Sequence, residues 1–130
     1  MTTTPNTHLK INAALCGTPM ELSPGRATVS LTTTEEMVAD ARGLVHGGFV
    51  FGLVDYAAML AVNDPYVVLG SADVRFVAPV AVGDIVMATA EVTEEKGRKR
   101  VVTTTAVVGE RDVFRGTLTA FVLDKHVLDQ

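Results

Sequence analysis

The chain has 130 residues, of which 48% are hydrophobic, and this is the size and composition of one globular domain with its own core. Its formal net charge of −4 argues against a nucleic-acid-binding domain, because such domains are usually basic. The single cysteine, Cys16, has no partner for an internal disulfide, and no Cys and His residues have the spacing of a zinc site. We therefore expect no metal and a reducing environment.

We also expect the protein to be cytoplasmic, with no membrane partner. Residues 1–8 lack the basic and apolar stretches of a secretory signal. The apolar run after His46 is too short to span a bilayer, and it contains Asp55. Polar composition predicts a flexible N-terminus over residues 1–8, which leaves one domain over residues 9–126 and a short tail over residues 127–130.

The first half of the chain predicts short elements followed by one long helix. We expect a short helix over residues 9–15, with Asn6 or Thr7 as its N-cap. Apolar residues alternate with polar ones over residues 26–31, which predicts a strand with one wet face, and residues 20–22 are its expected hairpin partner. A polar connector with one helical turn follows over residues 34–43.

Residues 47–62 predict the long helix, and its apolar residues lie on all sides, so it should be buried on most of its surface. Pro65 disfavours helix in the residue before it and marks the end of this segment.

The sequence after Pro65 is typical of β-structure. Four β-branched segments are joined by short loops, most of which contain glycine, and this pattern predicts an antiparallel meander. The segments are residues 67–77, 84–93, 98–108 and 113–123. The chain is therefore predicted to be a single α+β domain, with a curved antiparallel sheet wrapped around one long central helix.

A His-Gly-Gly turn stands at the start of the long helix, and one carboxylate, Asp55, lies within it. A charge on an apolar helix is costly to bury unless it is paired or functional. Together with Gly43 and Ala57, these residues resemble the His-Gly-Gly…Asp motif of hotdog-fold thioesterases of the phenylacetyl-CoA thioesterase type. The resemblance covers residues 9–126. It implies that Asp55 acts in hydrolysis and that the backbone N–H of Gly47 binds the thioester oxygen.

The residues themselves suit this chemistry. The first N–H groups of a helix have no intrahelical partners, and the helix dipole favours negative charge there, so Gly47 and Gly48 can stabilise an oxyanion. Glycine also lets a carbonyl approach the backbone closely. The structural alternative is a tight helix entry. Asp55 could act as a general base or as a nucleophile, and its structural alternative is a buried carboxylate tied to a donor.

Gly47 and Asp55 are separated by eight residues, or about 12 Å of helix rise. Both can act on one carbonyl only if the helices of two subunits run antiparallel, so that Gly47 of one subunit faces Asp55 of the other. We therefore expect a homodimer with two equivalent sites. Hotdog dimers often pair into tetramers, and the residues leave a dimer of dimers open.

Other residues are weaker candidates for the site. His46 could position the substrate carbonyl or brace the loop, and Asn63 could bind substrate or cap the helix. The basic run over residues 96–100, with Arg98, Lys99 and Arg100, could receive the phosphates of CoA, or it could be a solvated hairpin. Arg75 is a second phosphate candidate, although pairing with Asp73 would equally explain it.

The leading interpretation is an acyl-CoA thioesterase that hydrolyses a thioester to a carboxylic acid and free CoA, with no cofactor. An acyl carrier protein in place of CoA stays open as the thiol carrier. The alternative from another class is a non-catalytic hotdog module that binds acyl-CoA and has a regulatory or scaffolding role, since folds are reused across functions. A hydratase or dehydratase is disfavoured, because a proline-rich segment would be expected after the histidine.

Overall fold

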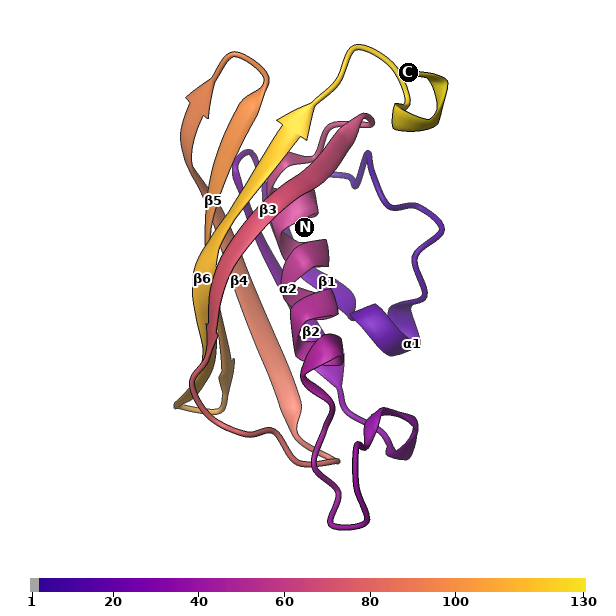
Figure 1. Cartoon of the computed structure of the whole chain (residues 1–130), viewed down its shortest axis with the longest axis vertical. Helices are drawn as coiled ribbons and strands as arrows, with labels where there is room; N and C mark the ends of the chain where they lie inside the picture. The colour runs from indigo at the N-terminus through magenta and orange to yellow at the C-terminus, as the bar shows by residue number, and fades with distance from the viewer. Residues whose placement is uncertain (1–2) are drawn as a thin grey trace.

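A curved sheet of six antiparallel strands wraps around one long helix in the computed structural model, which describes residues 3–130 (Figure 1). The order across the sheet is β1-β2-β4-β5-β6-β3. The strands are β1 (Thr18–Ser23), β2 (Arg26–Thr32), β3 (Val67–Phe76), β4 (Ile85–Lys96), β5 (Lys99–Val108) and β6 (Arg111–Val122). The helices are α1 (Ala13–Cys16) and α2 (Gly47–Val62), with 3₁₀ turns η1 (Glu35–Met37) and η2 (Val127–Asp129). The predicted α+β hotdog architecture is confirmed.

The central helix α2 begins and ends at the predicted residues. His46 is its N-cap, and Asn63 ends it in the left-handed conformation with φ of 54°. Nine of its residues are buried, because the sheet curves around it and takes up most of its apolar surface. On the sheet side, the inward residues of β2 alternate as predicted: Ala27, Val29 and Leu31 are buried, while the residues between them are partly exposed.

All four predicted strands after Pro65 form; β4 and β6 are longer than predicted, and β3 and β5 are each one residue shorter. β4 continues through Glu94 and Glu95 to Lys96, and the turn to β5 is centred on Gly97, whose φ of +58° suits glycine. β6 likewise begins at Arg111. Polar side chains occupy the ends of these strands because both faces are wet there, so the alternation of apolar residues stops before the backbone ladder does.

The short N-terminal helix lies later in the chain than predicted. Asn12 is the N-cap of α1, and its side chain accepts a hydrogen bond from Ala14 N at 3.0 Å. The predicted caps have other roles: Asn6 N donates to Oδ1 of Asn63 at 2.7 Å, and Thr7 is only 6% exposed. The domain limits at residues 9 and 126 stay predictions.

Two features of the fold bear on partners. β3 lies at one edge of the sheet and pairs only with β6 among the described residues 3–130, so within them one side of its ten-residue backbone has no strand beside it. No helix within residues 3–130 combines the length and apolar composition needed to cross a bilayer.

Candidate active site

The N-terminus of α2 presents backbone donors that nothing in residues 3–130 uses. The His46 side chain makes no capping hydrogen bond, and the first N–H of the helix with a backbone acceptor is that of Phe49, which donates to His46 O at 3.1 Å. The N–H groups of Gly47 and Gly48 have no acceptor in the described chain. They are therefore available to a carbonyl oxygen or an oxyanion.

An apolar cavity of about 240 Å³ lies at this end of the helix. Its lining consists of Val45, Gly47, Val50, Phe76, Ala78, Pro79, Val80 and Val113. A Cβ on Gly47 would stand 3.3 Å from Cε1 of Phe76, so only glycine leaves the backbone fully open to the cavity. The cavity can accept an aliphatic or aromatic acyl group, and it places that group beside the free amide of Gly47.

Asp55 is half-buried on α2, and its Oδ1 atom is buried without any hydrogen-bond partner among the described residues. Burial raises the pKa of this carboxyl above its ordinary value of 3.8. The donor that a purely structural role would require is not found in residues 3–130. A buried, unpartnered carboxylate with a raised pKa is better suited to accept a proton than an exposed one.

Cys16 and Tyr56 are the titratable neighbours of this region. Burial raises the pKa of the Cys16 thiol, and the charge of Asp55 raises it further. Burial also raises the pKa of Tyr56, whose ring stacks on His8 with the centroids 6.1 Å apart. Asp55 therefore lies near a protonated thiol, and no positive charge is among the causes of its pKa shift.

One chain does not bring Gly47 and Asp55 together. The cavity that Gly47 lines does not include Asp55, and about 12 Å of helix separates the two residues. Gly48, Gly52 and Asp55 follow one another along one side of α2 at helical spacing. A Cβ on Gly52 would meet no atom within 4 Å, so the middle of this side of the helix has space for a second helix.

His46 and Asn63 stand at opposite ends of α2. The His46 ring is exposed and makes an edge contact with Phe49, with centroids 6.2 Å apart, and no hydrogen bond from it is found in the described chain. Asn63 has a structural role: besides the bond from Asn6, its Nδ2 donates to Thr4 O at 3.1 Å. Both polar groups of its side chain are used far from the cavity, so the structure favours the helix cap over substrate binding.

The predicted phosphate residues lie away from the cavity. Arg75 pairs with Asp73 at 3.0 Å on the strand face opposite to Phe76, which lines the cavity. Arg98 pairs with Asp124, and Arg100 pairs with Glu95 at 3.2 Å. The hairpin that also carries Lys99 stands at the end of the sheet opposite to the N-terminus of α2 (Figure 1). Within one chain, these arginines are therefore partnered and distant from Gly47.

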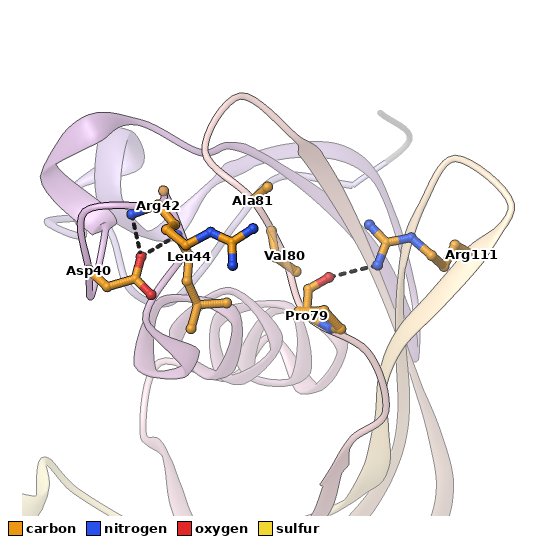
Figure 2. Close-up of a pocket in the computed structure, with 8 residues that line it drawn as sticks. Asp40, Arg42, Leu44, Pro79, Val80, Ala81 and Arg111 are labelled. Atoms are coloured by element: carbon orange, nitrogen blue, oxygen red, sulfur yellow. Dashed lines mark hydrogen bonds between the residues drawn. The ribbon is translucent and has the colours of Figure 1, made fainter.

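A second cavity, of about 480 Å³, shares Pro79 and Val80 with the first and was not expected from the sequence. Figure 2 shows residues that line it. It is lined by Asp40, Arg42, Gly43, Leu44, Pro79, Val80, Ala81 and Arg111. Arg42 stands in the loop just before the His-Gly-Gly turn, and this position in the sequence could have indicated that Arg42 lies near the site. Arg111 comes from the distant β5–β6 hairpin, and no pattern in the sequence joins it to that loop.

No group of three or more His, Cys, Asp and Glu residues is placed to hold a metal ion within residues 3–130.

Comparison with known proteins identifies the class. The family model of FlK, described as a fluoroacetyl-CoA-specific thioesterase, matches residues 58–126, which is more than half of the chain. A mutant of the phenylacetic acid degradation protein PaaI from Thermus thermophilus superposes with a TM-score of 0.77 at 29% identity, covering 85% of this chain and 96% of that one. The chain therefore belongs to the hotdog-fold thioesterase superfamily. The matched range begins after Asp55, so the model does not cover the residues of the candidate site.

Other similar proteins have diverse names. An uncharacterised protein from Pyrococcus horikoshii superposes with a TM-score of 0.96 at 49% identity, covering 98% of both chains. A methylthioribose-1-phosphate isomerase from Aquifex aeolicus is 50% identical over 119 residues, which are 91% of this chain and 26% of that protein. A transcription factor FapR from Caldanaerobacter subterraneus is 29% identical over 119 residues, which are 91% of this chain and 60% of the factor. The chain thus spans about a quarter of the isomerase and less than two thirds of this factor.

Proposed function

We propose that the protein is an acyl-CoA thioesterase that releases a carboxylic acid and free CoA. The observation that carries the proposal is the buried, unpartnered Oδ1 of Asp55 on the same helix whose first N–H groups, at Gly47 and Gly48, are free. Hydrolysis of a thioester requires a group that activates water or attacks the carbonyl, and a group that stabilises the oxyanion. The Asp55 carboxylate can activate water or attack the carbonyl, and the free N–H groups can stabilise the oxyanion.

The two groups act on one carbonyl across a dimer interface. In a two-fold dimer with antiparallel α2 helices, the Gly47 N–H of one subunit faces Asp55 of the other. The free edge of β3 supports this arrangement, because pairing of two β3 strands would continue the sheet and place the two α2 helices side by side. Gly52, where a Cβ would meet no atom within 4 Å, offers space for that approach. A dimer of dimers is a further assembly that the same dimer permits.

The reaction can follow either of two routes. As a general base, Asp55 takes a proton from water while the water oxygen bonds to the thioester carbon, and the carbon–sulfur bond then breaks to release the thiol. As a nucleophile, the Asp55 carboxylate itself bonds to that carbon and the thiolate leaves, taking a proton from solvent. Water then hydrolyses the resulting anhydride. In both routes the Gly47 N–H stabilises the oxyanion. Hydroxylamine would trap the anhydride of the second route.

The test measures thiol release from a panel of aryl and linear acyl-CoAs. We expect the reaction itself to take place in the cytoplasm. Asp55→Asn keeps the shape of the side chain and should lower kcat by at least about a hundredfold, the usual contribution of a positioned acid or base. Asp112→Asn is the matched control, because it removes one carboxylate at the exposed β5–β6 hairpin. Near-normal turnover by Asp55→Asn would overturn the assignment.

A second candidate function is an acyl-CoA-binding module without turnover. The similarity to transcription factors named FapR favours it, since a related domain occurs in regulators. Its expected result is binding of acyl-CoA with no release of thiol by the wild-type protein. That outcome would leave the unpartnered Asp55 carboxylate without a role, which is why hydrolysis is the leading proposal.

A further inference from the structure

The two cavities at the N-terminal end of α2 are adjacent, since Pro79 and Val80 line both. The smaller one is apolar and contains the Gly47 backbone. The larger one carries two arginines, and their guanidinium groups point toward one another across the segment at Val80 (Figure 2). An apolar chamber that opens beside a cationic one fits a ligand with an apolar end and an anionic end.

Arg42 is the free cation of the pair. Its guanidinium group makes no hydrogen bond or ion pair with any described residue, although Asp40 is close in sequence. The Asp40 carboxylate is occupied by the backbone instead: its Oδ1 accepts from Arg42 N at 2.9 Å and from Leu44 N at 3.1 Å. This turn fixes the backbone that carries Arg42 and leaves the guanidinium for another partner.

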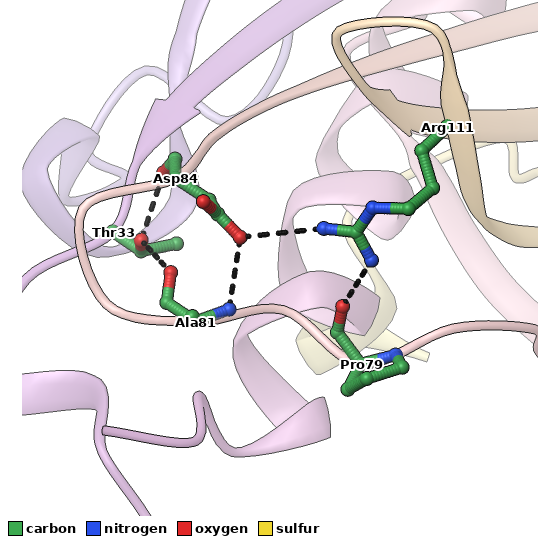
Figure 3. Close-up of polar contacts among 5 residues, drawn as sticks. All are labelled: Thr33, Pro79, Ala81, Asp84 and Arg111. Atoms are coloured by element: carbon green, nitrogen blue, oxygen red, sulfur yellow. Dashed lines mark hydrogen bonds and ion pairs between the residues drawn. The ribbon is translucent and has the colours of Figure 1, made fainter. Parts of the chain in front are cut away.

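Arg111 is held in place by the opposite wall. It donates to Pro79 O at 2.7 Å and pairs with Asp84 at 3.5 Å (Figure 3). Asp84 is itself anchored, because its Oδ2 accepts from Ala81 N at 2.9 Å and its carbonyl accepts from the Thr33 hydroxyl at 2.8 Å. A guanidinium has five N–H donors, so Arg111 keeps donors for a ligand after these contacts.

We propose that Arg42 and Arg111 bind the phosphate end of the thiol carrier while its acyl group occupies the cavity at Gly47. This inference rests on the proposed function and names the binding site of its carrier. Two like charges that face one another across an open cavity favour an anion between them, and guanidinium groups match phosphate oxygens geometrically. The phosphate that adjoins pantetheine is common to CoA and to carrier proteins. The two arginines thus replace the Arg98–Arg100 hairpin as the phosphate ligands.

The experiment measures the dissociation constants of CoA, dephospho-CoA, phosphopantetheine and pantetheine by titration calorimetry. Arg42→Gln should weaken binding of the first three about tenfold and leave pantetheine, which has no phosphate, unchanged. Arg111→Gln should weaken binding similarly. Arg111→Lys keeps a positive charge beside Asp84, so it is the control for a loop that is disturbed by loss of that ion pair. Arg26→Gln on β2 is the matched control for loss of one positive charge.

Each outcome decides the inference. Equal CoA affinity in wild type, Arg42→Gln and Arg111→Gln would overturn the site, and so would a loss seen with Arg98→Gln instead. A loss confined to CoA, with dephospho-CoA unaffected, would assign the arginines to the 3′-phosphate and overturn the pantetheine-linked assignment. Thiol release is measured separately, so a protein that binds CoA through Arg42 and hydrolyses nothing would refute only the proposed hydrolysis. A wild type that binds none of the phosphate ligands overturns the inference itself.

Discussion

Asn63 joins the end of the central helix to the start of the chain, because its Oδ1 accepts a hydrogen bond from Asn6 N at 2.7 Å. The same residue has a φ of 54°, which asparagine tolerates better than most residues. Its Nδ2 bonds to Thr4 O, so one side chain ends α2 and holds the N-terminal segment over it.

Replacement of Asn63 should separate these two roles. Asn63→Gly loses the two side-chain hydrogen bonds but still tolerates the left-handed turn. Asn63→Ala loses the same two bonds and also disfavours the turn. We expect Asn63→Ala to be the less stable of the two by about 1 kcal/mol, which corresponds to a Tm lower by about 4 °C. Thermal unfolding by circular dichroism measures the difference. Equal melting temperatures would show that the turn conformation contributes nothing, and a changed KM for acyl-CoA would return Asn63 to the list of substrate ligands.

The raised pKa of Asp55 predicts a stability that depends on pH. Because burial raises the folded-state pKa above 3.8, the native state holds the proton more strongly than the unfolded chain does, and stability falls as pH rises through the interval between the two values. Asp55→Asn should therefore have a higher Tm than wild type at pH 7, and the difference should vanish at about pH 3. Melting curves across this range test it, with Asp112→Asn as the control. A lower Tm for Asp55→Asn at pH 7 would contradict the prediction.

His8 should make the N-terminal segment sensitive to acid. Burial against Tyr56 lowers the pKa of His8 below 6.5, so the unfolded chain binds the proton more readily, and stability is lost as pH falls from 6.5 through the lowered folded-state value. His8→Phe keeps an aromatic ring at this position and removes the titration. The Tm of wild type should fall between pH 7 and pH 5 by more than the Tm of His8→Phe. Parallel curves for the two proteins would refute the role of His8.

Gly52 offers a test of the proposed dimer. Within one chain a side chain at this position meets open space, so Gly52→Leu should fold, and it should gain helix propensity relative to glycine. If α2 packs against the α2 of a partner, however, the added side chain obstructs that approach. Sedimentation velocity should then show a monomer for Gly52→Leu and a dimer for wild type, with thiol release lost together with the dimer. Gly25→Leu is an unsuitable control because the φ of Gly25 is +80°, and Lys99→Leu on the exposed hairpin serves instead.

The parts of the structure that the sequence predicted well are those set by local rules. The apolar run and Pro65 defined the long helix, and the alternation over residues 26–31 defined β2. The predictions were wrong where contacts between residues far apart in the sequence determine the structure. Asn6, one of the predicted caps of the first helix, bonds to Asn63 instead, and Asn12 caps α1. Arg98 forms an ion pair with Asp124, which lies 26 residues away. Arg42 and Arg111 line one cavity for the same reason, since the β5–β6 hairpin returns to the loop before α2 only in the folded sheet.

The start of α2 also has a consequence for stability. Ser, Thr, Asp or Asn at an N-cap satisfies one of the first helical amides and typically adds about 1 kcal/mol, yet His46 makes no such bond. A Ser at this position would be a natural choice for a more heat-resistant variant, and its hydroxyl would compete for the N–H groups of the first helical turn. The missing capping bond at the start of the central helix therefore marks a position where stability can be gained, and we expect the gain to lower activity.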